Sequence, residues 1–203
     1  MSISAQDRAR IATAIRAVEA KTSGEIVCVL AHASAGTTAL PVFIAAVAAL
    51  ALPWLLVATT DMAVDRILSL QVVVFLGLMM LFALPRVRVA LMPNRTRRAI
   101  AHRNAREQFD LRGVAHTKDR TGVLIFVSLA EHYARIIADE GIAARVPQSR
   151  WQGAVDALVT HMRDGRIADG FVTAIERCGD ELASHFPRQG GDRDELANRI
   201  YLI

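Results

Sequence analysis

Two long blocks of uncharged residues constrain this chain more than any other feature of its sequence. The first runs over residues 39–58, ALPVFIAAVAALALPWLLVA, and the second over residues 67–84, ILSLQVVVFLGLMMLFAL. A helix of about 20 residues crosses the hydrocarbon core of a bilayer, so both blocks are long enough, the second only just. Two buried core helices are the alternative, but a chain this short leaves little protein to cover them. We therefore predict a transmembrane helical hairpin over residues 39–84.

Composition agrees with this prediction and excludes two other classes of protein. Hydrophobic residues make up 53% of the chain and the mean hydropathy is +0.30, whereas soluble proteins are about 45–50% apolar on a similar count. So many apolar residues argue against a disordered chain. Only two cysteines are present, which excludes a disulfide scaffold. We expect Cys28 and Cys178 to be buried, reduced thiols.

The charges predict how the hairpin is oriented. From Arg86 to Arg120 there are ten basic residues against three acidic ones, whereas the link between the blocks carries two acids and one base. Basic residues near span ends stay in the cytoplasm, so we predict a two-pass protein of a bacterial inner (plasma) membrane with both termini cytoplasmic. Residues 85–95 form a basic juxtamembrane linker. Five arginines are expected to face anionic lipid headgroups: Arg86, Arg88, Arg95, Arg97 and Arg98.

The same basic run could suggest nucleic-acid binding, because the sequence pI is about 9.7. The run lacks interleaved aromatic residues and directly follows a predicted span, however. Attraction to anionic headgroups explains it more simply. We therefore expect the lipid bilayer, and a membrane-protein partner, but no nucleic acid.

Helices and strands are predicted on both sides of the hairpin. A helix capped by Ser4 and Asp7 precedes a strand over 25–32, and an apolar strand covers 121–130. Residues 131–142 fit a helix and a strand nearly equally well. Two amphipathic helices follow near 151–162 and 171–186, with a turn over 163–170 in which Asp169 is expected to cap a helix. The tail, residues 188–203, is expected to be loop-like, with an apolar end that could return to the core.

The order of these elements predicts one domain in two pieces. The segment before the hairpin is too short to bury a core of its own. An even number of spans returns the chain to the side on which it started. We therefore predict that residues 1–38 and 96–187 form a single α/β domain that the hairpin interrupts.

Four stretches of the sequence resemble the TPM-domain family: SGEIVCVLA near residue 24, then TGVLIFVSLAEHYARIIADEGI, GRIADG and AIERCGDEL. The resemblance covers roughly residues 4–34 and 96–187. It implies a three-layer α/β/α sandwich around a small mixed sheet, and on this basis we assign 131–142 to a strand. Some plant members act in photosystem repair and are described as acid phosphatases. Many bacterial members are uncharacterised membrane proteins.

Two groups of acidic residues are candidates for metal binding. Asp139 and Glu140 end a predicted strand, where paired carboxylates could hold Ca²⁺ or Mg²⁺, and a solvated turn is the alternative. Asp192, Asp194 and Glu195 form a second acidic group beside two glycines, and a flexible loop is the alternative there. The sequence has no Walker A, HExxH or GxSxG motif, so no catalytic residue can be assigned.

Two hypotheses of function follow, and the sequence leaves open whether the protein is an enzyme. The first is a membrane-anchored accessory module that binds a partner, with or without a divalent metal, in the maintenance of membrane or envelope proteins. The second, implied by the resemblance, is a metal-assisted acid phosphatase that acts on phosphate esters.

Overall fold

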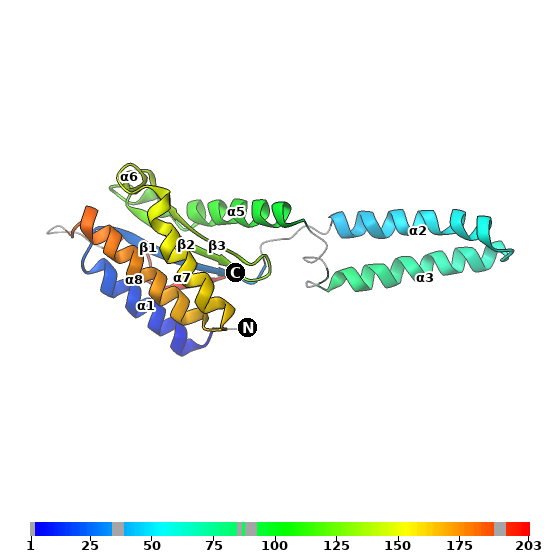
Figure 1. Ribbon diagram of the computed structural model, residues 1–203, viewed down its shortest axis with the longest axis horizontal. Helices are drawn as coiled ribbons and strands as arrows, with labels where there is room; N and C mark the ends of the chain where they lie inside the picture. The colour runs from blue at the N-terminus through cyan, green and yellow to red at the C-terminus, as the bar shows by residue number, and fades with distance from the viewer. Residues whose placement is uncertain (1–2, 34–38, 85–86, 88–92, 189–193) are drawn as a thin grey trace. The chain divides into compact units, whose positions relative to one another are not determined.

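The chain forms two compact units in the computed structural model, which describes residues 3–33, 39–84, 87, 93–188 and 194–203 (Figure 1). Met1–Ser34 and Arg98–Ile203 make up the first unit, and Ala35–Arg97 the second. We call the first the α/β unit and the second the hairpin unit. Parts of the chain far apart in sequence thus build the α/β unit together.

A mixed sheet of four strands, in the order β3-β2-β1-β4, lies at the centre of the α/β unit. β1 pairs in parallel with both β2 and β4, whereas β3 runs antiparallel to β2. The strands are β1 (Glu25–Ala31), β2 (Gly122–Ser128), β3 (Tyr133–Ala138) and β4 (Ile200–Leu202).

Helices cover both faces of this sheet (Figure 1). Side chains alternate between the two faces of a strand, so β1 contributes Cys28 to one apolar cluster and Val29 to another. The Val29 face is covered by α5 (Asn94–Leu111), through Ala105 and Phe109. The predicted three-layer α/β/α sandwich is confirmed. Three helices cover the Cys28 face: α1 (Ala5–Glu19), α7 (Gln152–Arg163) and α8 (Ile167–His185).

Local signals explain where α1 and α8 begin. Ser4 Oγ accepts a hydrogen bond from the Asp7 N–H at 3.0 Å, and Asp7 Oδ2 accepts one from the Ser4 N–H at 3.3 Å, which is the predicted capping box. The predicted turn over 163–170 is too long, because Gly165 reverses the chain with a φ of 77°. α8 therefore begins at Ile167, and Asp169 lies in its first turn instead of capping it.

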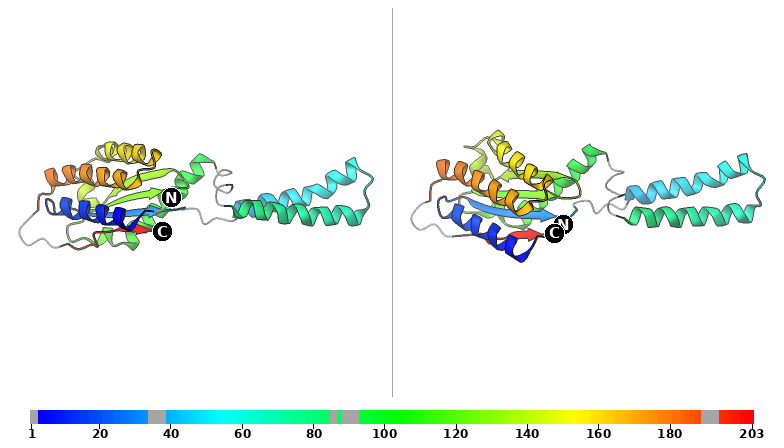
Figure 2. Two further views of the ribbon diagram at one scale, coloured as in Figure 1. Left: turned by 90° about the horizontal axis from the view of Figure 1, so that it is seen from below. Right: turned by 60° about the horizontal axis from the view of Figure 1, so that its bottom comes forward.

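The end of β3 and the C-terminal tail also differ from the expectation. β3 ends at Ala138, and the short helix α6 (Glu140–Ala143) takes the place of the strand's predicted continuation to 142. The expected loop-like tail supplies β4, which pairs with β1 and lies beside it in Figure 2. Two short 3₁₀ helices complete the unit: η1 (Val114–His116) and η2 (Gln148–Trp151).

The hairpin unit contains α2 (Ala39–Thr59) and α3 (Val64–Ala83), which pack against each other. Both are long and apolar enough to span a membrane, with mean hydropathies of 2.4 over Val42–Thr59 and 2.1 over Val64–Ala83. Few of their side chains are buried; Ala45, Ala49 and Ile67 are among those that are.

Gly179 allows α8 to approach α1 closely. A Cβ at this position would lie 2.6 Å from both Cγ atoms of Val18, and a β-branched side chain cannot turn away easily. We expect Gly179→Ala to reduce the free energy of unfolding by about 1–3 kcal/mol. Urea unfolding of the full chain in detergent micelles, followed by Trp151 fluorescence in a Trp54→Phe background, measures this change.

Gly153→Ala in α7 is the matched control. A Cβ there would meet only Arg177 Nη1, at 3.7 Å, so the substitution is expected to leave stability unchanged or raise it by up to about 1 kcal/mol through helix propensity. Similar losses in both variants would show that close packing at Gly179 is not the cause.

Candidate functional site

Asp139 and Glu140, the first predicted pair, lie where β3 ends and α6 begins. Asp139 is the N-cap of α6, and its Oδ1 accepts the Glu140 N–H at 2.7 Å. The Asp139 side chain is 3% exposed, whereas that of Glu140 is 85% exposed. The two carboxylates are adjacent in sequence but lie in different surroundings.

Arg120 forms ion pairs with both carboxylates. Its Nε lies 3.0 Å from Asp139 Oδ2, and its Nη2 lies 3.1 Å from Glu140 Oε2. The first contact is an ion pair without an aligned hydrogen bond, because Oδ2 has none within the described residues. Arg120 also has a φ of 55°, a left-handed conformation that is uncommon for a residue other than glycine. The guanidinium thus takes the position between the two acids that a bound cation would need.

No sequence motif indicates that Arg120 would meet this pair, because it is one of ten basic residues between Arg86 and Arg120. The pairing depends on the register of β2 and β3, in which Val123 lies opposite Ala138. The Asp139 N–H donates to the Gly122 carbonyl at 2.9 Å. This contact brings the residues that precede β2 beside those that follow β3.

A cavity of about 480 Å³ lies beside this pair, and we call it the loop pocket. Arg145 stacks over the Phe186 ring, with its Cζ 5.0 Å from the ring centroid. Gly141 admits no side chain, since a Cβ there would lie 2.5 Å from the Asp119 carbonyl oxygen. The pocket therefore combines an acid, a guanidinium and an imidazole with backbone groups. Its lining residues are Ser23, Asp119, Thr121, Gly141, Arg145, His185, Phe186 and Pro187.

The second acidic group attaches the C-terminal segment to the rest of the α/β unit. Asp194 Oδ1 lies 3.6 Å from Arg188 Nη2, and Glu195 Oε2 accepts the Lys118 N–H at 2.9 Å. Asp192 lies outside the described residues. Over residues 3–33, 39–84, 87, 93–188 and 194–203, no three His, Cys, Asp or Glu side chains are placed to hold a metal ion.

Two further glutamates, Glu19 and Glu25, lie near this segment. Glu25 accepts the N–H groups of Glu195 at 3.2 Å and Leu196 at 3.3 Å. Glu19 is buried, and its Oε1 accepts the Ile26 N–H at 2.9 Å. Burial raises the pKa of Glu19 to about 8, with a smaller contribution from the nearby Glu25 charge. The sequence does not single out Glu19, because a glutamate on a helix is usually solvated.

The predicted membrane-surface arginines are described only in part. Arg95, Arg97 and Arg98 lie in the first turns of α5, and Arg97 donates a hydrogen bond to Asn94 Oδ1. Arg95 and Arg98 are exposed. Arg86 and Arg88 lie outside the described residues.

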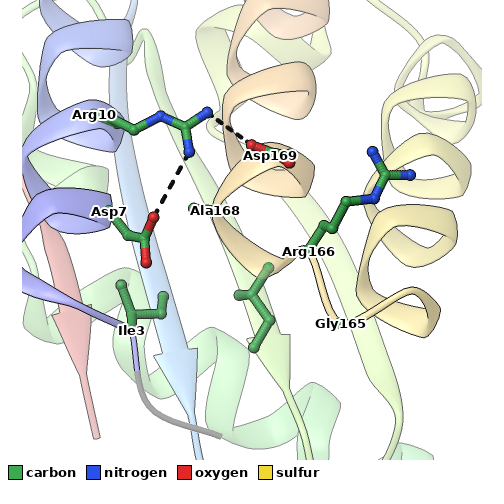
Figure 3. Close-up of a pocket in the computed structure, with 8 residues that line it drawn as sticks. Ile3, Asp7, Arg10, Gly165, Arg166, Ala168 and Asp169 are labelled. Carbon is green, nitrogen blue, oxygen red and sulfur yellow. Dashed lines mark hydrogen bonds and ion pairs between the residues drawn. The ribbon is translucent and has the colours of Figure 1, made fainter.

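A smaller hollow of about 180 Å³ separates the first turns of α1 and α8 (Figure 3). Arg10 Nη2 donates to Asp169 Oδ1 at 2.7 Å, and Arg10 also lies 3.6 Å from Asp7. The hydrogen bond from Arg10 lowers the pKa of the Asp169 carboxyl. Arg166, on the rim, pairs with Asp164 at 2.8 Å. The ion pair between Arg10 and Asp169 thus links α1 to α8 across the hollow.

The fold defines a class of protein: a mixed four-stranded sheet between two helical layers, built from segments on either side of a helical hairpin. Residues 85–181 match the sequence model of the TPM domain. This match confirms the resemblance to the TPM-domain family seen in the sequence.

One solved structure shares the fold. The NMR structure of the BA42 protein from the psychrophilic bacterium Bizionia argentinensis sp. nov. superposes with a TM-score of 0.62 at 22% sequence identity. The match covers 100% of this chain and 97% of that one. No curated protein matches the chain.

Glu19 should make the protein less stable as the pH rises. Its pKa is 4.5 in a free carboxyl and about 8 in the fold. The fold therefore keeps a proton that the unfolded chain releases, so this contribution to stability is full below pH 4.5 and is lost progressively as the pH rises to about 8. Thermal unfolding from pH 5 to 9 is expected to show a falling Tm. Glu19→Gln keeps a neutral side chain and should flatten this dependence, whereas Glu107→Gln, a surface control, should not. A parallel fall in Glu19→Gln would assign the effect to another group.

Proposed function

We propose that this protein is a TPM-domain binding module, anchored by α2 and α3 in a bacterial inner membrane, that assists membrane or envelope proteins. The outward-facing apolar side chains of the hairpin carry this proposal. Trp54 is 82% exposed and Met80 79% exposed, and Phe43, Leu50 and Leu76 are exposed as well. Water disfavours an apolar surface of this extent, whereas lipid tails solvate it.

The charges next to the hairpin support an orientation with both termini in the cytoplasm. Asp61 and Asp65 lie in or beside the short link between α2 and α3. Arg95, Arg97 and Arg98 follow the second helix along the chain. Basic residues near span ends favour the cytoplasmic side, where anionic lipids attract them.

Reporter fusions test this topology. A reporter active only outside the cytoplasm should work when inserted at residue 62 and fail at the C-terminus, because a hairpin returns the chain to its starting side. A reporter active only inside should give the reverse result. The protein should also remain in the membrane pellet at alkaline pH. A C-terminus found outside would contradict the proposal.

The Arg120 ion pairs favour binding over metal-assisted hydrolysis. Ca²⁺ takes 6–8 oxygen ligands, but one Asp139 oxygen caps α6 and the other faces Arg120. A cation would have to displace the guanidinium from both acids. The residues present therefore do not fit a resident metal, and any divalent-metal binding at this pair competes with Arg120.

The loop pocket offers a place for a ligand or a segment of a partner. Its volume of about 480 Å³ falls within the range of about 300–1,000 Å³ found for ligand sites. Its polar lining, with Asp119, Arg145 and His185, suits a group that carries hydrogen-bonding atoms. This cavity supports a binding role that needs no metal.

Hydrolysis assays separate the two functions. We expect no turnover of p-nitrophenyl phosphate by the full chain with Mg²⁺ or Ca²⁺, because Arg120 competes for the two acids. Arg120→Gln should raise the affinity for Ca²⁺ at least tenfold in calorimetry, since it frees both carboxylates. Turnover by the wild type that Asp139→Asn abolishes, with the fold intact by circular dichroism, would instead establish the phosphatase.

A further inference from the structure

Two arginines, a histidine and a tyrosine gather where α5 packs on β3, and we call them the α5–β3 cluster: His102, Arg106, Tyr133 and Arg135. The Tyr133 hydroxyl lies 3.4 Å from His102 Nδ1 and joins the two elements. His102 and Arg106 are four residues apart on a helix and so share one face. Tyr133 and Arg135 are two residues apart on a strand and so share one face of the sheet. This is the face that α5 covers, because Tyr133 packs in the same apolar cluster as Ala105 and Phe109.

Among the described residues, the charged groups of this cluster, His102, Arg106 and Arg135, form no ion pair with an acid. Other arginines are paired: Arg103, one residue from His102, bonds Glu107 at 3.0 Å. Partial burial and the charges of Arg135 and Arg106 lower the pKa of His102. The repulsion among these groups favours the binding of an anion.

We propose that the α5–β3 cluster binds a phosphate group, and that this phosphate is the headgroup of an anionic phospholipid. Guanidinium groups match phosphate oxygens in a two-point geometry, which a single ammonium cannot do. Arg135 is half-buried on β3, and it shares its face of the sheet with Tyr133. The contact between the Tyr133 hydroxyl and His102 leaves one further O–H or N–H for a phosphate oxygen when the ring is neutral, and two when it is protonated.

The position of α5 in the chain favours a lipid as the source of the phosphate. Only residues 84–93 separate α5 from α3. Arg95 and Arg98 are exposed near the start of α5, so the helix carries positive charge from its first turn to Arg106. The choice of a lipid rests on the membrane anchoring proposed above, whereas the phosphate chemistry does not.

Titration of His102 by NMR measures binding at this site. The full chain is held in dodecyl maltoside micelles, and the His102 ring signal is assigned from a His102→Gln spectrum. Phosphatidylglycerol added to the micelles should raise the pKa of His102 by about one unit, because an opposite charge within about 4–6 Å favours the protonated ring. Phosphatidylcholine, which has no net charge, should produce no shift. Inorganic phosphate should produce a smaller shift of the same sign.

Charge-matched variants identify the residues that hold the phosphate. Arg135→Gln and Arg106→Gln should each weaken phosphatidylglycerol binding at least tenfold. Arg103→Gln removes the same charge from the same helix, but this side chain is 84% exposed and already paired, so its affinity should stay within twofold of the wild type. An equal loss in Arg103→Gln would show a diffuse charge effect and overturn the site.

The remaining outcomes are also decisive. If no anion shifts His102, the site is absent, and alkaline extraction reports separately whether the membrane anchor stands. If inorganic phosphate acts as strongly as phosphatidylglycerol, the phosphate site stands and the lipid assignment falls. A larger shift with a DNA oligonucleotide at equal phosphate concentration would also overturn the lipid assignment.

Discussion

The parallel pairing of β1 with β2 holds the α/β unit together, because it joins segments on either side of the hairpin. The two strands pair over their whole length, from Glu25 with Gly122 to Ala31 with Ser128, and every residue in both is buried. Parallel neighbours need a long crossover connection, and here that connection contains α2 and α3. β4 then adds to the other edge of β1. β1 thus lies inside a sheet whose other described strands all follow it in the sequence.

The strand registers also determine what the acidic pair can do. With β3 aligned antiparallel to β2, the Asp139 N–H meets the Gly122 carbonyl, and Arg120 falls next to both acids. The backbone is tight on both sides: a Cβ on Gly122 would lie 2.3 Å from the Val114 carbonyl oxygen. The strand pairing that positions the two adjacent carboxylates therefore also places beside them the cation that neutralises them. In the sequence, Asp139 and Glu140 suggest a metal site. In the fold, both are paired with Arg120 and lie beside the loop pocket.

The sequence predicted those features that depend on local pattern. Strands buried on both faces are continuous apolar runs, so the sequence predicts β1 and β2 to within a few residues at their ends. Ser4 and Asp7 form the capping box that predicts the start of α1. β4 was missed because Ile200–Leu202 is short and gains its partner only from the folded sheet. Arg120 and Glu19 were missed for a similar reason. Glu19 lies in the core, where a carboxyl oxygen accepts a hydrogen bond from the Ile26 N–H at the start of a buried strand.

The helical hairpin lowers the entropic cost of pairing β1 with β2. β1 has neither neighbour until the chain has passed through α2 and α3, and an unpaired apolar strand readily forms wrong pairings. A flexible connection between β1 and β2 would carry an entropic cost that grows with its length. α2 and α3 instead run antiparallel, so the beginning of α2 and the end of α3 lie at the same end of the hairpin unit (Figure 1). With the hairpin formed, the flexible part of the connection is reduced to the residues on either side of it. The apolar blocks that are long enough to span a membrane thus also favour the pairing on which the α/β unit depends.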